Sequence, residues 1–235
     1  MFKKKPIIEY EPLADYGDHS ILPAKKFIPD WYKKIPPFKD DLVYKMDVGF
    51  LKTVKLCIPF LDAFSSGYMI TLPYDIYIKN NDGAPYLTTP YAVSEKNIPK
   101  WRSKVAHEQT VPPGCFPYEY TWNSCISYTL PKGYSALVTH PFNRYDLPFT
   151  TLTGIIDGGF SVYSHGSFPF YIKDGFEGII PKGTPIIQIL PFRQEKWKSK
   201  KTLGLVKEGE KHNNSSGNVI SGWYKKTFWK RKNYE

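Results

Sequence analysis

The chain of 235 residues has few cysteines, and these form none of the usual metal-binding or disulfide patterns. The three cysteines, Cys57, Cys115 and Cys125, contain no C-x-x-C pair, which argues against a zinc site and against a disulfide framework. No apolar run approaches the roughly 20 residues of a membrane-spanning helix, and the first residues hold no apolar segment typical of a signal peptide. We therefore expect a protein of the reducing cytoplasm that has no membrane partner.

The sequence also lacks the common local signatures of phosphate and ester chemistry. It has no P-loop, no G-x-S-x-G, and no G-x-G-x-x-G that opens a helix, so no glycine-rich phosphate cradle is indicated. Its five histidines form no H-x-H or H-x-D pair. A non-haem iron oxygenase needs two histidines and a carboxylate, which only the fold could assemble here, from His107, Glu108, His140, Asp146 and His165. This is the third of three functional hypotheses, and we assign no metal ligand.

Aromatic residues, proline, glycine and positive charge are abundant. Aromatics make up 17% of the chain, with 18 Tyr and 15 Phe, beside 21 Pro and 17 Gly. Aromatic side chains favour strands while Pro and Gly interrupt them at turns, so this mixture predicts a mostly β protein. The formal net charge is +10. Such a charge fits an anionic partner, and it equally fits lysines that only keep the surface solvated.

The distribution of proline and lysine divides the chain into three parts. We predict an extended N-terminal arm (1–52) packed on the body, a β core domain (53–195) and a basic, aromatic C-terminal tail (196–235). Within the arm, Ile28–Lys34 predicts one helical turn capped by Asp30. Within the tail, Asn213–Gly217 is typical of a flexible linker, and the aromatic stretch Trp223–Trp229 is expected to dock on another surface.

Short alternating segments separated by turn residues predict the strands of the core. Val54, Leu56 and Ile58 alternate with polar residues, and Asn80–Gly83 predicts a hairpin turn. The other expected strands are 68–73, 74–79, 125–130, 134–139, 151–156, 160–163, 168–172 and 186–190. Many short strands at close spacing favour a sandwich or a barrel-like antiparallel fold.

Two motifs within Gly133–Phe192 give the chain a recognisable pattern. Gly154, Ile155, Ile156, Asp157 and Phe160 match a G-V-I-D-x-x-Y strand and turn. About thirty residues later, Gly183, Ile186, Gln188 and Ile189 match a G-D-R-I-A-Q-L strand. In order and spacing the pair resembles the dUTPase and dCTP-deaminase superfamily, over roughly a quarter of the chain. The resemblance implies a β-clip fold and a homotrimer with pockets between subunits.

The same resemblance implies roles for several residues. Asp157 would orient a water as general base, Phe160 would stack on a sugar, and Mg²⁺ would be the cofactor. Where the family carries a P-R-S-G phosphate motif, this chain has His140–Arg144, so Arg144 would hold the phosphate beside Asn143 and His140. Gln188 of the second motif would complete the ligand-binding set. The family's glycine-rich C-terminal arm has no counterpart here, which weighs against triphosphate hydrolysis.

Three functional hypotheses follow, and they remain open at the level of sequence. The first is a nucleotide hydrolase or deaminase relative that binds or hydrolyses a nucleotide-like anionic small molecule in an intersubunit pocket. The second is a non-catalytic assembly protein that reuses the fold, such as a phage virion component, in which Asp157 only forms a turn. The third is the iron oxygenase. The stretch from Pro29 to Arg193 also resembles an uncharacterised domain family of bacteria and tailed phages, which implies no activity.

Overall fold

The computed structural model describes residues 5–13, 19–39, 51–81, 83–90, 99–101, 110–122, 125–159, 168–217 and 223–235. All strand pairs in these residues are antiparallel, so the prediction of a mostly β, antiparallel protein is confirmed. In the described part of the chain, no helix combines the length and apolar character that crossing a membrane requires.

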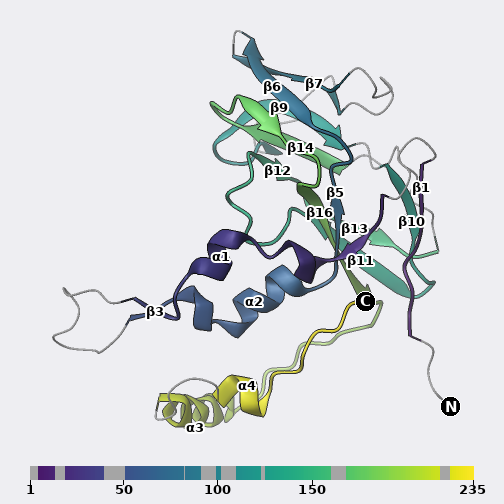
Figure 1. The fold of residues 1–235 in the computed structure, drawn as a ribbon. Coiled ribbons are helices and arrows are strands. Elements are labelled where there is room, and N and C mark those ends of the chain that lie inside the picture. Colours follow the sequence, from purple (N-terminus) through teal and green to yellow (C-terminus); the bar gives the residue numbers. More distant parts are fainter. Residues whose placement is uncertain are drawn as a thin grey trace.

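The largest sheet has five strands and unites the two sequence motifs (Figure 1). In spatial order its strands are β13 (Gly154–Asp157), β11 (Tyr134–Thr139), β16 (Pro185–Arg193), β5 (Tyr68–Thr71) and β2 (Leu22–Pro23). The first motif forms β13 and the second forms most of β16, and both strands pair with β11 between them. Two segments separated by some thirty residues thus lie one strand apart.

A second sheet supplies the aromatic part of the core. Its strands are β12 (Phe149–Thr151), β14 (Phe168–Lys173), β9 (Cys115–Trp122) and β8 (Lys100–Trp101). The Trp122 ring stacks on Phe170 with 3.5 Å between centroids, and Phe149 meets Trp122 edge-on. The Trp122 Nε1–H donates to Thr151 Oγ1 at 2.9 Å, so the buried indole keeps a polar partner.

Three smaller sheets complete the β structure. They are the three-stranded sheet of β15 (Gly178–Ile180), β6 (Ile76–Asn81) and β7 (Ala84–Thr88), the pair of β1 (Glu9–Pro12) and β10 (Ile126–Thr129), and the pair of β3 (Phe38–Lys39) and β4 (Leu51–Lys52). The expected hairpin at Asn80–Gly83 is confirmed by the β6–β7 pairing. The predicted single strand 151–156 is wrong, because the chain leaves the second sheet after Thr151 and enters the first at Gly154. The expected strand 160–163 lies outside the described residues.

The described residues also include helical segments. They are η2 (Ala24–Phe27), α1 (Asp30–Lys34), η4 (Val54–Leu56), α2 (Ile58–Ser65), α3 (Leu205–Gly217) and α4 (Trp223–Thr227). The expected helical turn is confirmed as α1, although Asp30 pairs with Lys33 and makes no cap hydrogen bond. The alternation at Val54–Ile58 does not form a strand, since Pro59 occupies the first turn of α2, where its fixed φ is suited to a helix.

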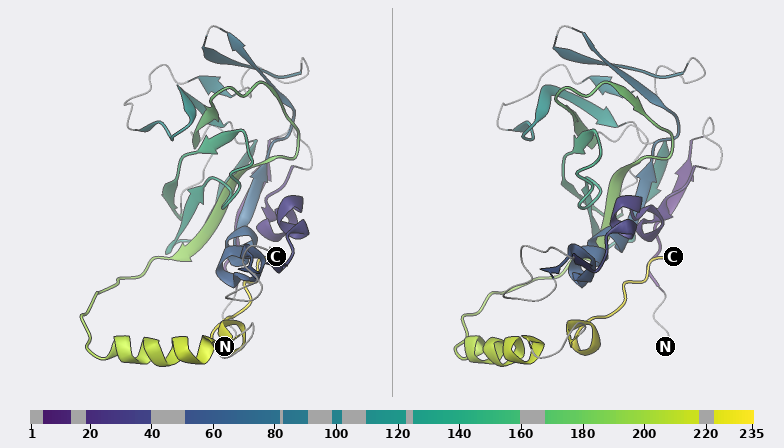
Figure 2. Two further views of the ribbon diagram at one scale, coloured as in Figure 1. Left: turned by 90° about the vertical axis from the view of Figure 1, so that its left-hand side faces the viewer. Right: turned by 60° about the vertical axis from the view of Figure 1, so that its left-hand side comes forward.

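The C-terminal region leaves the sheets and then returns. Figures 1 and 2 show α3 and α4 set apart from the sheets, with the last residues running back toward them. The expected linker Asn213–Gly217 is wrong, because these residues form the last turns of α3. The expected docking of the aromatic stretch is confirmed at Trp229, whose Nε1–H donates to Asp62 Oδ2 of α2 at 2.8 Å.

The large sheet has one covered face and one open corner. Ala136, Val138 and Ile189 point into the core and are fully buried. Side chains alternate along each strand, so their neighbours face the other way. On that side α2 covers part of the sheet, while Ile155 is 66% and Phe192 41% exposed. The open corner therefore includes the end of β13 at which Asp157 lies.

Candidate functional site

Asp157 stands at the end of β13 within a small group of polar side chains. Its Oδ1 accepts a hydrogen bond from Ser135 Oγ at 2.7 Å and another from Gln194 Nε2 at 3.1 Å. Gln194 Nε2 also donates to Ser135 Oγ at 3.0 Å. Ser135 comes from β11 and Gln194 follows β16, so residues from two other strands of the large sheet hold the carboxylate. Both hydrogen bonds found among the described residues use Oδ1, while the side chain is exposed.

Two glycines fix the turn that carries Asp157. The Gly158 N–H donates to Tyr134 O at 2.7 Å, and the Gly159 N–H donates to Leu130 O at 2.9 Å. A Cβ at Gly158 would lie 2.3 Å from Pro131 O and 2.7 Å from Tyr134 O. These are backbone atoms and cannot swing aside, so the turn seats on residues 130–134 only while position 158 is glycine.

Two exposed cations lie on the segments that hold Asp157. Lys132 belongs to the turn against which Gly158 and Gly159 are bound, and Arg193 immediately precedes Gln194. Arg193 pairs in register with Tyr134, so its side chain leaves the sheet on the opposite face from Ser135 and Asp157. We refer to Lys132, Ser135, Asp157 and Gln194 as the Asp157 site. It combines one exposed carboxylate with one cation on the adjoining turn, a set that suits a phosphorylated ligand bearing hydroxyl groups.

The loop after β11 contains the residues expected to bind phosphate, and its polar groups bind one another. Arg144 makes a two-pronged ion pair with Asp146, with Nε to Oδ1 and Nη2 to Oδ2 both at 2.9 Å. Burial alone would raise the pKa of Asp146, but Arg144 holds that pKa below its usual value. Asn143 takes the left-handed φ of 58° that closes the loop. The guanidinium of Arg144 is thus already paired within the chain.

His140 lies between two backbone groups at the start of this loop. Its Nδ1 accepts the Thr151 N–H at 3.3 Å, so Nε2 carries the proton and donates to Arg144 O at 3.1 Å. Burial lowers the pKa of His140, which keeps the ring neutral. Both ring nitrogens are engaged, so this histidine offers no free ligand atom to an iron ion.

Gln188 connects the same loop to α2 through a fully buried amide. Its Oε1 accepts the Phe142 N–H at 2.8 Å, and its Nε2 donates to Ala63 O at 2.9 Å and to Ser66 O at 2.7 Å. Three backbone groups from two separate segments thereby converge on one side chain of β16. The amide is satisfied inside the chain, as a buried polar group must be.

The predicted residues do not gather in one place within the chain. Asp157 pairs with Ser135 at the beginning of β11, whereas His140 follows the end of that strand. Four residues of β11 lie between Ser135 and His140, so the two positions are about 17 Å apart. A single pocket that holds both Asp157 and Arg144 would therefore need two subunits. Phe160 lies outside the described residues.

The described residues include no group of three or more His, Cys, Asp or Glu side chains that could hold a metal ion. Of the set considered for iron, His107, Glu108 and His165 lie outside these residues. The Asp157 site contributes a single carboxylate. Mg²⁺ is commonly held by one or two carboxylates together with the phosphates of a bound substrate, and that is the arrangement Asp157 would permit.

The sequence motifs do not include Ser135, Gln194 or Lys132. Ser135 is one of several small polar residues in alternating strands, and Gln194 follows a strand without any motif of its own. Their relation to Asp157 depends on the pairing register of β11 with β13 and β16. No signal in a single sequence specifies that register.

Comparison with solved structures gives a remote likeness. No protein-family model matches the chain, and no curated protein matches it. The structure is similar to a point mutant of the dUTPase from phage phi11 of S. aureus, solved to describe the coordination of a structural Mg(II) ion. The identity is 12%, the TM-score is 0.33, and the match covers 84% of this chain and 97% of that one. The two sequence motifs resemble the same family. The likeness is remote and concerns the fold alone.

Proposed function

We propose that the protein binds a nucleotide-like anionic small molecule at the Asp157 site and hydrolyses it there. The observation that carries this proposal is an exposed carboxylate, fixed by Ser135 and Gln194, on the sheet where both motifs meet. Asp157 is suited to orient a water or to accept a ligand hydroxyl through its exposed Oδ2. Lys132, on the turn to which Gly158 and Gly159 are bound, would supply the positive charge that developing negative charge on phosphate requires.

The proposal includes a homotrimer, since Asp157 and the His140–Asp146 loop lie at opposite ends of β11. In a pocket between subunits, the Asp157 site of one chain would face a surface of the neighbouring chain. That surface would supply the stacking side chain for which Phe160 was predicted. Mg²⁺ would enter with the phosphates of the ligand.

A thermal-shift screen of nucleotides, with and without Mg²⁺, tests this function. A nucleotide present at a hundred times its dissociation constant should stabilise the native protein by about 2.7 kcal/mol. In Asp157→Asn, the side chain keeps an oxygen that can accept the hydrogen bond from Ser135, while the carboxylate that would act as base is lost. We expect this variant to retain the thermal shift while turnover of the bound nucleotide falls at least about 100-fold.

Asp174→Asn is the matched control, because Asp174–Gly175 is another exposed Asp-Gly turn, after β14. It should leave both the shift and the turnover unchanged. A native protein whose melting temperature responds to no nucleotide would exclude the proposed function. Equal turnover by the native protein and Asp157→Asn would show that another group is the base.

A second candidate function, assembly without catalysis, is favoured by the exposed apolar side chains of the C-terminal excursion. Residues 195–228, here called the C-terminal excursion, are held at both ends, by Gln194 at the Asp157 site and by Trp229 on α2. Between these anchors Trp197 is 86%, Leu203 89% and Val206 75% exposed. Apolar side chains displayed in this way are typical of an interface.

Light scattering tests the assembly. The native protein should have a mass three times the 27.1 kDa of one chain. If the excursion makes the contact, the triple variant Trp197→Ser, Leu203→Ser, Val206→Ser should fall toward the mass of one chain while keeping its melting temperature. A native protein that is a monomer on dilution would contradict both the trimer and the assembly function.

A further inference from the structure

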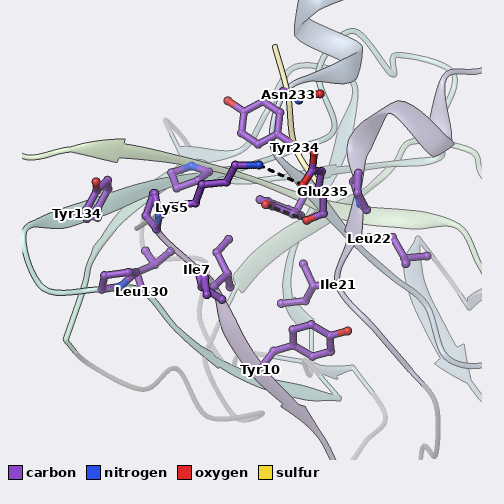
Figure 3. Close-up of a pocket in the computed structure, with 16 residues that line it drawn as sticks. Lys5, Ile7, Tyr10, Ile21, Leu22, Leu130, Tyr134, Asn233, Tyr234 and Glu235 are labelled. Atoms are coloured by element: carbon purple, nitrogen blue, oxygen red, sulfur yellow. Dashed lines mark hydrogen bonds and ion pairs between the residues drawn. The ribbon is translucent and has the colours of Figure 1, made fainter. Parts of the chain in front are cut away.

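A cavity lies between the N-terminal and C-terminal segments of the described chain. It measures about 810 Å³ and opens between residues 5–10 of the N-terminal segment and the last residues, Asn233–Glu235. Figure 3 shows the two chain ends reaching over it, with Leu130 and Tyr134 on one side and Leu22 on the other. The volume lies in the range of sites that hold a drug-sized molecule.

Aromatic and aliphatic groups form most of the cavity wall. Four tyrosines line it, Tyr10, Tyr68, Tyr134 and Tyr234, together with isoleucine, leucine and proline side chains. Tyr68 and Tyr234 already meet edge-on with 5.6 Å between ring centroids. Flat aromatic rings and proline rings provide stacking surfaces for a planar ligand, and tyrosine hydroxyls provide a few hydrogen bonds.

The two charged side chains at the cavity pair with each other. Among the described residues its lining has one cationic side chain, Lys5, and one acidic side chain, Glu235, and these pair at 3.4 Å. A charged ligand would enter an apolar space without an opposite charge to receive it, which is costly. A neutral ligand avoids that cost.

The N-terminal and C-terminal segments close the cavity in a way that permits opening. The Lys5–Glu235 pair joins them, and its side chains are 81% and 68% exposed. An exposed pair of this kind contributes little to stability. The cavity also lies on the other face of the large sheet from Asp157, because Tyr134 lines it and the next residue, Ser135, binds the carboxylate.

We infer that this cavity is a second binding site, specific for a neutral, largely aromatic small molecule of at least bicyclic size. The site is independent of the nucleotide function proposed for Asp157. Entry requires the chain ends to part at the Lys5–Glu235 pair. The ligand then lies among the four tyrosines.

Two related fluorescent probes test the class of ligand. N-phenyl-1-naphthylamine is neutral, and 1-anilinonaphthalene-8-sulfonate has the same rings with an added sulfonate. Both become bright in apolar sites. The neutral probe should bind the native protein at least about tenfold more tightly than the anionic one.

Two matched substitutions locate the probe. Ile7 lines the cavity and is 63% exposed, and Ile155 is 66% exposed on the open corner of the large sheet. Ile7→Trp should fill the cavity and weaken binding of the neutral probe at least about tenfold, whereas Ile155→Trp should change it less than about twofold. Nucleotide thermal shifts should be unchanged by Ile7→Trp, so the two proposals can fail separately.

Three results would overturn the inference. They are the absence of neutral-probe binding to the native protein, equal or tighter binding of the sulfonate, and an equal response to Ile7→Trp and Ile155→Trp. Probe binding is compared only for variants whose melting temperature equals that of the native protein. Should Ile7→Trp fold poorly, Ile7→Ser, which removes an apolar wall group, is expected to weaken the neutral probe in the same direction.

Discussion

Gln188→Leu is expected to lower the free energy of unfolding by about 3 kcal/mol or more, because each buried polar group left without a partner costs about 1–3 kcal/mol. Leucine has a similar size and no hydrogen-bonding atoms. It would leave the Phe142 N–H and the carbonyls of Ala63 and Ser66 without the partners they have now. Urea denaturation measures the loss as a lower midpoint at unchanged slope.

Gln194→Leu provides the matched control for the same chemical change. Gln194 is exposed, so water can replace its hydrogen bonds to Ser135 and Asp157. We expect this variant to lose no more than about 0.5 kcal/mol, as is usual at the surface. Similar losses of unfolding free energy in the two variants would mean that the hydrogen bonds of Gln188 do not hold the loop after β11, α2 and β16 together.

Gly158→Ala should destabilise the protein by about 3 kcal/mol, at the upper end for overpacked positions. The new Cβ would meet the Pro131 and Tyr134 carbonyl oxygens at distances far below any ordinary contact. The turn has to move, and it carries Asp157 with it. Nucleotide-induced thermal shifts should therefore shrink in the same variant, measured against its own melting temperature.

Gly154→Ala is the comparison for this glycine. Gly154 lies at the other end of β13. A Cβ at this position would meet nothing within 4 Å, and the φ of Gly154 is not in the left-handed region. The variant should retain both stability and nucleotide response. If Gly158→Ala were as stable as Gly154→Ala, the turn would not be seated on residues 130–134 as described.

Much of the fold was predictable because its signals are local. The β6–β7 hairpin follows from Asn80–Gly83, and β11 and β14 follow from short apolar segments between turn residues. The missed elements depend on particular neighbours. Helix α2 is stabilised by Phe60 and Phe64, whose rings meet Tyr32 of α1. Tyr32 is far from Phe60 and Phe64 in the sequence, so their contact produces no periodic pattern within the eight residues of α2.

The site was predictable in part for the same reason. The motif around Asp157 names the carboxylate, and the turn glycines beside it are visible in the sequence. Arg144 is expected as its cation because it stands where the resembled family carries its phosphate motif. A whole strand, β11, separates the two regions within one chain, and strand pairing brings Ser135 and Gln194 to Asp157. The motif names Asp157, whereas its neighbours depend on the strand register.

Hydrogen-exchange mass spectrometry, with the nucleotide that gives the largest thermal shift, tests the central claim most directly. Binding at the Asp157 site should slow exchange in residues 132–135, 154–159 and 193–194, the three segments that form it. Exchange in the segment 140–146 should slow less. Protection confined to residues 140–146, with no change around Asp157, would contradict the account.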